Sequence, residues 1–255
     1  MNGLRLSDIY KFTERPVESS WHRPAMMGVH FANGWVEATD AHILIREKYE
    51  YDSELEGKII GRYGEEIDGV FPNCEKAIPK FFSEGYEPLR IDWNMLYDIC
   101  QVLVILGQQH YCECAIKVGN CYFYPKHLKT IAAMCVRHEC SVIYLCNARP
   151  CNAAAVPLGY GAMAVVARGE SELFFDYGYP LDYGNRRERM SELHDELQGF
   201  LFNLNEQLTK YKVVQNYKMQ MKRKALVMKI GRFETCIRIL EKYIGKNIMG
   251  GKINE

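Results

Sequence analysis

The hydrophobic pattern of the chain changes at about residue 185, and this change limits the folds that it can adopt. Beyond that point, apolar side chains recur at alternating steps of three and four residues, at Met190, Leu193, Leu197, Leu201, Leu204, Leu208 and Tyr211. After a basic segment at 218–224, a second series follows at Leu226, Ile230, Phe233, Ile237, Leu240 and Ile244. Such steps align apolar side chains on one face of an α-helix. We therefore predict a helical hairpin or a coiled coil over residues 185–255.

Before residue 185, helical and strand-like patterns alternate. We predict helices at 4–15, 93–106 and 125–138, and strands at 28–31, 35–38, 42–46, 89–92, 114–118, 120–123, 141–146, 153–156 and 162–166. Asn33-Gly34 is a strong hairpin signal between the first two strands. A helix followed by several strands thus occurs at least twice. We predict an α+β fold with one unit and a connector at 1–88, a second unit at 89–184, and a helical extension at 185–255.

Two short segments give a more specific indication of the protein family than these helical and strand-like patterns do. Residues 36–44 read VEATDAHIL, and residues 70–79 read VFPNCEKAIP. In order and character they resemble the paired signature of the bacterial DNA polymerase sliding clamp, the beta subunit of the replicative polymerase. In that family the two segments form the walls of a pocket for the clamp-binding peptides of polymerases and repair proteins.

The resemblance implies DNA-clamp-like repeated βαβββ units and a partner-peptide pocket. Its residues here would be Thr39, Ala41, His42, Ile43 and Leu44 on one wall, Pro72, Lys76 and Ala77 on the other, and Val165 in a closing strand. The sequence departs from the family in a shorter spacing between the segments and at two positions. The family has a glycine at Ala41, where it permits positive φ, and a basic residue at Ile43. A clamp-like strand retained only for packing is the alternative interpretation.

Basic side chains on two predicted helices suggest contact with duplex DNA. Clamps encircle a duplex with helices whose Lys and Arg side chains reach the phosphates without reading the bases. The candidates here are Lys11, Arg15, Lys126, Lys129 and Arg137. A solvated helix face is the alternative interpretation. The helix at 93–106 has no Lys or Arg and is apolar all round in its second half, so we expect it to be buried under the C-terminal helices.

The net charge of zero hides an uneven distribution. Residues 186–255 carry 15 Lys and Arg against 8 Asp and Glu, whereas residues 1–185 carry 17 against 24. The chain is therefore an acidic body with a basic extension. No run of apolar residues approaches the length of a membrane span, and the first residues lack the apolar core of a signal peptide. We expect a cytoplasmic protein.

The ten cysteines do not have the paired C-x2-C spacing of a zinc ribbon. We expect reduced cysteines that act as small core residues, with a metal site at Cys112, Cys114 and His110 or His138 as the alternative. No GxSxG, HExxH, P-loop or GxGxxG motif is present, so we expect no catalytic residues and no cofactor.

These patterns together predict a non-catalytic, sliding-clamp-like protein. We expect it to bind partner peptides and duplex DNA as a homo-oligomer, because two or three units per chain would not close a ring alone. The alternative is a clamp-derived interaction or oligomerisation scaffold that does not encircle DNA.

Overall fold

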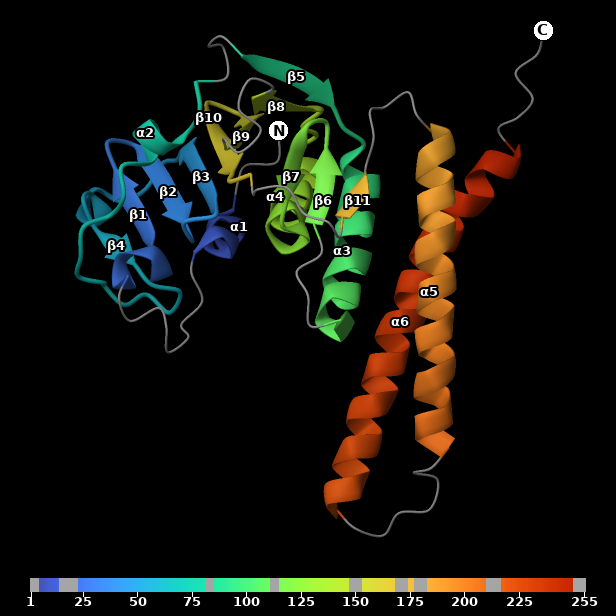
Figure 1. Ribbon diagram of the computed structural model, residues 1–255. Coiled ribbons are helices and arrows are strands. Elements are labelled where there is room, and N and C mark those ends of the chain that lie inside the picture. The colour runs from blue at the N-terminus through green and yellow to red at the C-terminus, as the bar shows by residue number, and fades with distance from the viewer. Residues whose placement is uncertain are drawn as a thin grey trace, which may run out of the picture.

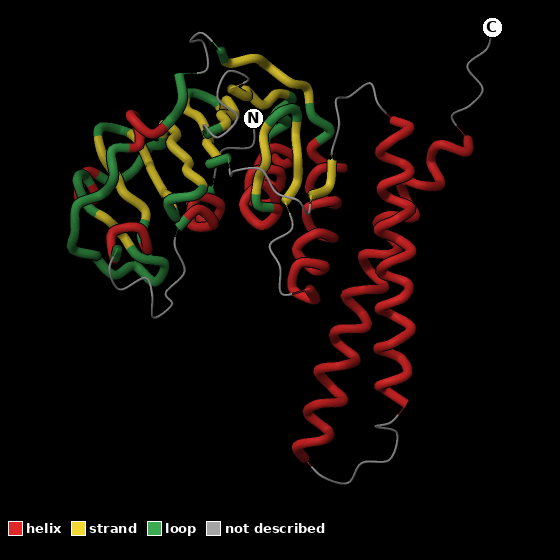
Figure 2. The backbone as a smooth tube through the Cα atoms, in the orientation of Figure 1, coloured by secondary structure: helices red, strands yellow, loops and turns green. Residues whose placement is uncertain are grey.

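The computed structural model describes residues 5–13, 23–80, 85–110, 115–146, 153–167, 174–176, 183–209 and 217–249, which form an α+β fold (Figures 1 and 2). Its helices are α1 (Leu6–Ile9), α2 (Cys74–Ala77), α3 (Trp93–His110), α4 (Pro125–Arg137), α5 (Tyr183–Thr209) and α6 (Tyr217–Met249), with short 3-10 turns at Tyr10–Phe12, Pro24–Met27 and Ser53–Leu55. Its strands are β1 (Val29–Ala32), β2 (Trp35–Thr39), β3 (Ile43–Lys48), β4 (Ile59–Ile60), β5 (Tyr86–Arg90), β6 (Ala115–Val118), β7 (Cys121–Phe123), β8 (Val142–Cys146), β9 (Ala154–Leu158), β10 (Gly161–Val165) and β11 (Phe174–Asp176).

The main sheet has eight antiparallel strands in the order β4-β1-β2-β3-β10-β9-β8-β5. Its two halves meet where β3 pairs with β10, with Ile43 opposite Val165 and Leu44 opposite Ala164. In each half a helix precedes three consecutive strands, α1 before β1–β3 and α4 before β8–β10. Segments more than 110 residues apart therefore lie side by side at the centre of the sheet.

Local sequence signals account for many element boundaries. Asn33 and Gly34 both have positive φ, 54° and 75°, as the tight turn between β1 and β2 requires. The Asp92 carboxylate caps α3 by accepting a hydrogen bond from the Met95 N–H at 3.0 Å. Pro125 stands in the first turn of α4, where its missing N–H costs nothing. The predicted hairpin and the predicted start of the helix at residue 125 are thus confirmed.

The first helix and the second sheet differ from the prediction. The first helix is α-helical only to Ile9 and continues to Phe12 as a 3-10 turn, shorter than the predicted 4–15. A second sheet, in the order β11-β6-β7, contains the parallel strand β11, which the sequence did not predict. β11 has three residues, too few for an alternating pattern to be recognised.

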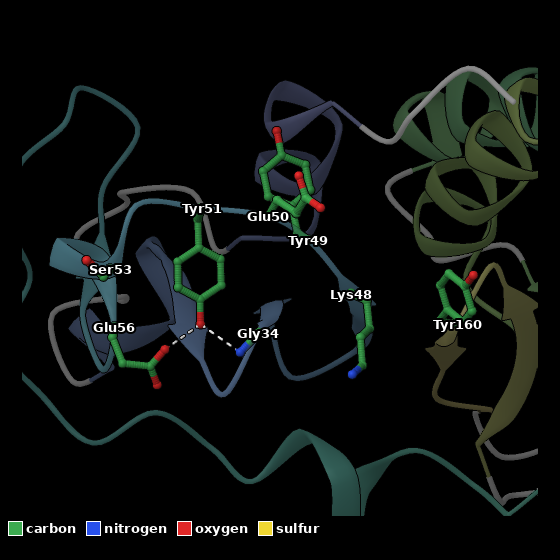
Figure 3. Close-up of a pocket in the computed structure, with 8 residues that line it drawn as sticks. All are labelled: Gly34, Lys48, Tyr49, Glu50, Tyr51, Ser53, Glu56 and Tyr160. Carbon is green, nitrogen blue, oxygen red and sulfur yellow. Dashed lines mark hydrogen bonds between the residues drawn. The ribbon is translucent and has the colours of Figure 1, made fainter.

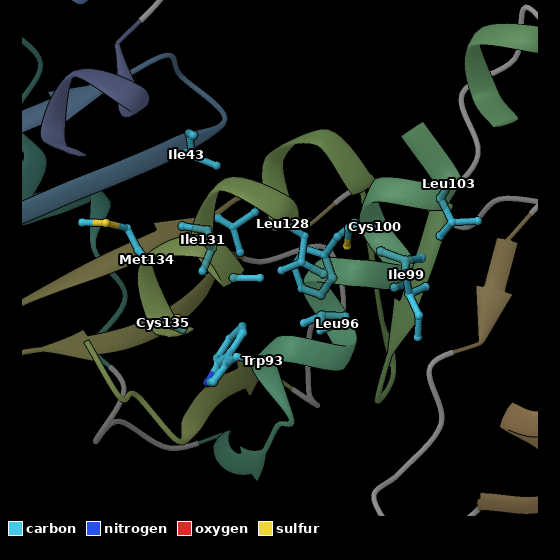
Figure 4. Close-up of a cluster of buried hydrophobic side chains, with 14 of the residues drawn as sticks. Ile43, Trp93, Leu96, Ile99, Cys100, Leu103, Leu128, Ile131, Met134 and Cys135 are labelled. Carbon is cyan, nitrogen blue, oxygen red and sulfur yellow. The ribbon is translucent and has the colours of Figure 1, made fainter. Parts of the chain in front are cut away.

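The hydrophobic core lies between one face of the main sheet and helices α3 and α4 (Figure 4). Because side chains alternate along a strand, Ile43 and Ile45 of β3 enter this core. Helices α3 and α4 contribute side chains from facing sides, among them Leu96, Ile99, Leu103, Leu128, Ile131 and Cys135. Val102 and Leu106 of α3 are also buried, as the apolar second half of that helix predicts.

Helices α5 and α6 run side by side away from the sheet (Figure 1). The rings of Phe200 and Phe233 lie 6.0 Å apart between them. Apolar residues at the predicted three- and four-residue steps are buried here, namely Met190, Leu197, Leu204, Ile230, Phe233, Ile237 and Leu240. Tyr211 lies outside the described residues.

Helix α6 is joined to α3 through Asp98. The Asp98 carboxylate accepts hydrogen bonds from Tyr243 at 2.7 Å and from Lys242 at 3.1 Å. Burial, and then the hydrogen bond to Asp98, raise the pKa of Tyr243 to about 12, so the phenol remains a donor at neutral pH.

Candidate functional site

The first of the two clamp-like segments, residues 36–44, contains the turn between β2 and β3. The Asp40 carboxylate accepts hydrogen bonds from the backbone N–H groups of His42 and Ile43, both at 2.8 Å. The Thr39 hydroxyl donates to the Ile43 carbonyl at 2.8 Å and accepts from the Ala41 N–H at 3.1 Å. Short polar side chains that bond to nearby backbone in this way fix a turn. The Thr-Asp pair therefore has a structural role here.

Ala41 has a φ of 72°, although it is not a glycine. An L-residue with a Cβ pays about 1–2 kcal/mol in this left-handed region. The hydrogen bonds of Thr39 and Asp40 hold the turn against this cost. Ala41 thus adopts the left-handed conformation that a glycine, the residue of the sliding-clamp signature at this position, would permit without strain.

The two predicted segments meet on the face of the sheet opposite to helices α3 and α4. Leu44 of β3 and Ala164 of β10 form a separate apolar cluster there with Cys74 of α2. Phe71 and Ile78, from the two ends of the second segment, pack against this cluster. Leu44 is only 6% exposed as a result. The two segments are therefore in contact, and the side chains of the second segment cover Leu44.

Charged groups border the apolar cluster. The Glu37 carboxylate is buried and pairs with Arg46 at 2.9 Å and with His30 at 3.0 Å. Arg46 also lies 3.7 Å from Glu75 of α2, and the His30 ring stacks on Phe71 with centroids 4.7 Å apart. These contacts fasten residues 71–75 to strands β1 and β3.

The Cys74 thiol belongs to the apolar cluster and is buried. Burial, and then the charge of Glu37, raise its pKa well above the usual range, so the thiol remains neutral.

Two residues predicted for the pocket point away from it. Ile43 and Val165 are opposite one another in the β3–β10 pair, and both side chains enter the core on the helix side. Their neighbours Leu44 and Ala164 occupy the other face, because successive side chains on a strand alternate. The pocket assignment of Ile43 and Val165 is therefore corrected: both belong to the core, and Leu44 and Ala164 are the residues on the opposite face.

The remaining residues of the first wall lie at the turn. Thr39 is buried and Ala41 is exposed. His42 is also exposed, and its ring stacks on that of His127 in α4 with centroids 4.6 Å apart. His42 thus contacts the helix side and not the apolar cluster.

The second wall forms the short helix α2. The Asn73 side chain caps it by accepting a hydrogen bond from the Lys76 N–H at 3.1 Å. Pro72 is half-buried, whereas Lys76 and Ala77 are exposed. Phe71, Cys74 and Ile78 lie in the segment VFPNCEKAIP but are not among the predicted pocket residues. The apolar spacing within VFPNCEKAIP is the signal that could have identified them.

Two of the predicted DNA-contacting residues are engaged within the protein. The buried carboxylate of Asp8 accepts hydrogen bonds from Lys11, at 2.8 Å, and from Arg137. About half of the Arg137 side chain remains exposed. These two cations serve first to neutralise Asp8.

The other predicted DNA contacts differ in exposure. Lys126 is exposed, and its ammonium group lies 5.9 Å from the centre of the Tyr124 ring. Lys129 is half-buried, 5.4 Å from the ring of Tyr97 in α3. Arg15 lies outside the described residues.

A groove of about 790 Å³ lies beside the β1–β2 turn (Figure 3). The Tyr51 hydroxyl donates to Glu56 at 2.7 Å and accepts from the Gly34 N–H at 2.9 Å. The groove is lined by Gly34, Lys48, Tyr49, Glu50, Tyr51, Ser53, Glu56 and Tyr160. The predicted pocket residues do not line this groove.

Among the described residues, no group of three or more His, Cys, Asp or Glu side chains is placed to hold a metal ion. Cys112 and Cys114 lie outside these residues. Likewise, no described helix is long and apolar enough to cross a membrane.

Comparison with solved structures finds a similarity to the DNA polymerase III beta chain of Streptococcus pneumoniae TIGR4. The TM-score is 0.47 at 10% sequence identity, and the match covers 65% of this chain and 63% of that chain. This chain therefore spans less than two thirds of the length of that protein. A comparison with protein-family models gives no match, and a comparison with curated proteins gives none either.

Proposed function

We propose that this protein is a non-catalytic, sliding-clamp-like protein that binds peptide segments of partner proteins around Leu44. The observation that carries the proposal is the meeting of its two clamp-like segments at one apolar cluster, formed by Leu44, Cys74 and Ala164. The partners would be DNA polymerases or repair proteins in the cytoplasm.

The chemistry of this surface supports the proposal. A peptide groove needs an apolar floor for its anchors and a few polar groups that fix the backbone. Phe71 and Ile78, which cover Leu44 and Ala164 and are themselves half-buried, supply the apolar surface, and Arg46, Glu75 and Lys76 supply charged groups at its edge. A bound peptide would lie against α2 and contact Phe71 and Ile78.

Peptide binding can be tested by fluorescence anisotropy with a labelled peptide that carries adjacent Leu and Phe anchors. We expect saturable binding that weakens at least tenfold in Lys76→Glu, whose side chain is exposed on α2. The matched control is Lys224→Glu, an equivalent charge reversal on the exposed part of α6. Equal affinities for all three proteins would mean that the likeness to clamps is architectural only.

Duplex DNA is the second proposed ligand, reached through Lys126 and its neighbours. A homo-oligomeric ring should be retained on circular DNA and released when the circle is cut. Lys126→Glu should weaken retention and reduce its dependence on salt, because fewer counterions are released per contact. Equal exchange from circular and linear DNA would exclude sliding.

A scaffold that does not encircle DNA is the second candidate function. Exposed apolar side chains on α5 and α6 favour it, namely Phe202, Met221, Val227 and Met228, which are 49–66% exposed. Lys11 and Arg137 favour it too, because both are engaged by Asp8. Molar mass in solution tests it: oligomers that dissociate in a Met221→Glu, Met228→Glu double variant, without DNA retention in the unaltered protein, support the scaffold.

A further inference from the structure

The C-terminus of α4 brings two cysteines together. The His138 N–H donates to the Met134 carbonyl at 2.9 Å, and the Cys140 N–H donates to the Cys135 carbonyl at 3.0 Å. Glu139, between them, has a φ of 55°. In a Schellman motif, the N–H of the second residue after the C-cap donates to the carbonyl of the third-last helical residue, and the residue directly after the C-cap is left-handed. Cys140, Cys135 and Glu139 hold these three positions. This motif characteristically places the side chains of those two residues, here Cys135 and Cys140, in contact.

The two thiols differ in environment. Cys135 is completely buried, whereas Cys140 is half-buried, and its Sγ lies 3.6 Å from the Pro157 carbonyl oxygen. A hydrogen bond from the Cys135 thiol lowers the pKa of Cys140 and outweighs the effect of burial. Burial, and then Cys140, raise the pKa of Cys135. The more accessible sulfur of the pair is therefore the one that more readily forms a thiolate.

Three other described cysteines lack this combination. Cys74, Cys100 and Cys236 are buried, and burial raises the pKa of each, that of Cys236 to about 11. Thiol oxidation follows thiolate character and access. Cys140 should thus react before these three.

The geometry points to Cys140 and Cys135 as a dithiol that is oxidised by peroxides to a disulfide across the end of α4. Neither the clamp-like resemblance nor the proposed peptide binding requires such a site. Its substrate class is a hydroperoxide, with hydrogen peroxide as the simplest member.

The reaction proceeds in two balanced steps. The Cys140 thiolate attacks one oxygen of the peroxide, the O–O bond breaks, and hydroxide leaves, so the sulfur becomes a sulfenic acid. The Cys135 sulfur then attacks the Cys140 sulfur, the S–S bond forms, and the S–O bond breaks. The departing hydroxide takes the Cys135 proton and leaves as water. Two thiols and one peroxide thus give one disulfide and two waters.

The test uses the full chain and hydrogen peroxide. After brief oxidation, the protein is unfolded in guanidinium chloride, free thiols are blocked with N-ethylmaleimide, and the unreduced protein is digested with trypsin. Cleavage after Lys129, Arg137 and Arg168 separates the two cysteines, because trypsin does not cut between Arg149 and Pro150, so a disulfide links peptide 130–137 to peptide 138–168 with a mass loss of about 2 Da relative to the two thiols. We expect this linked pair at peroxide doses that leave Cys74, Cys100 and Cys236 alkylated.

Cysteine variants assign the roles. Cys140→Ser should lose the linked peptides completely, whereas Cys135→Ser should accumulate a sulfenic acid at residue 140 that dimedone traps. Cys146→Ser is the matched control, because Cys146 belongs to the same tryptic peptide as Cys140. The disulfide-linked peptides of Cys135 and Cys140 should form unchanged in this variant. Circular dichroism checks that each variant is folded. Oxidation of another cysteine first, or a Cys140 oxidised without linkage to Cys135, would overturn the inference.

Discussion

Arg137, in the last turn of α4, is paired with Asp8, a carboxylate of α1 that is only 2% exposed. The two residues are 129 positions apart in the chain. Each belongs to the helix that precedes three strands in its own half of the main sheet. The pair therefore joins the two halves on the helix side, as the β3–β10 pairing joins them in the sheet.

Replacement of Asp8 by Asn should destabilise the protein. The amide keeps the size of the side chain but loses its charge, so Arg137 and Lys11 lose a charged acceptor. A lost hydrogen bond to a charged group costs about 1.5–3 kcal/mol, and we expect a decrease toward the lower figure because Arg137 is half-exposed. Urea unfolding at pH 7 measures it. Lys11→Met, which leaves Arg137 in place, should cost less.

The same pair predicts a pH dependence. Burial raises the pKa of Asp8, but the hydrogen bonds from Arg137 and Lys11 outweigh it and leave the pKa below its ordinary value of 3.8. Its contribution to the free energy of unfolding is therefore complete above pH 3.8 and is lost as the pH falls through the folded-state pKa. The difference between the unaltered protein and Asp8→Asn should shrink on acidification. A constant difference would contradict this origin.

The sequence predicted the elements of this fold better than their contacts. Asn33-Gly34, Asp92 and Pro125 act locally, so their hairpin, cap and helix start could be read directly. The pairing of Asp8 with Arg137 could not, because the two residues are 129 positions apart and meet only in the folded protein. Val165 was assigned to the wrong face for a related reason. The face that its side chain occupies depends on the pairing register between β10 and β3, and a shift of that register by one residue would exchange the two faces.

Replacement of Ala41 by Gly should stabilise the protein. Ala41 has a φ of 72°, and glycine removes the steric cost of that conformation. Part of the gain is offset because glycine also makes the unfolded chain more flexible, so we expect a net gain of about 0.5–1 kcal/mol. Thermal and urea unfolding measure it. Ala225→Gly, in the exposed part of α6, is the control of opposite sign and should cost about 1 kcal/mol.

Replacement of Gly161 by Ala should destabilise the protein strongly. A Cβ at this position would lie 1.8 Å from the Arg46 carbonyl oxygen, which is rigid backbone of the paired strand. The β3–β10 junction would have to open, and overpacking of this kind typically costs about 1–3 kcal/mol or more. The shift of the urea midpoint measures it. Gly199→Ala is the control, because no atom lies within 4 Å of its Cβ position, and it should be neutral or stabilising in α5.

The turn before Gly161 is held by a buried carboxylate. Glu47 accepts hydrogen bonds from the N–H groups of Tyr160 at 2.9 Å and Gly161 at 3.0 Å. Burial raises the pKa of Glu47 and outweighs the lowering by these bonds. Since the folded state binds the proton more tightly, the contribution of Glu47 to stability falls as the pH rises from its ordinary 4.5 through the folded-state pKa.

Glu47→Gln removes this titration and leaves one acceptor oxygen for two N–H groups. We expect a loss of about 1–2 kcal/mol in the free energy of unfolding at pH 7, and a larger difference from the unaltered protein at pH 4.5. Urea titrations at both values measure it. Glu56→Gln is the control of opposite slope, because hydrogen bonds from the Asn33 N–H and from Tyr51 lower the pKa of Glu56. If both variants shift in the same direction with pH, the Glu47 carboxylate is not the group that titrates with folding.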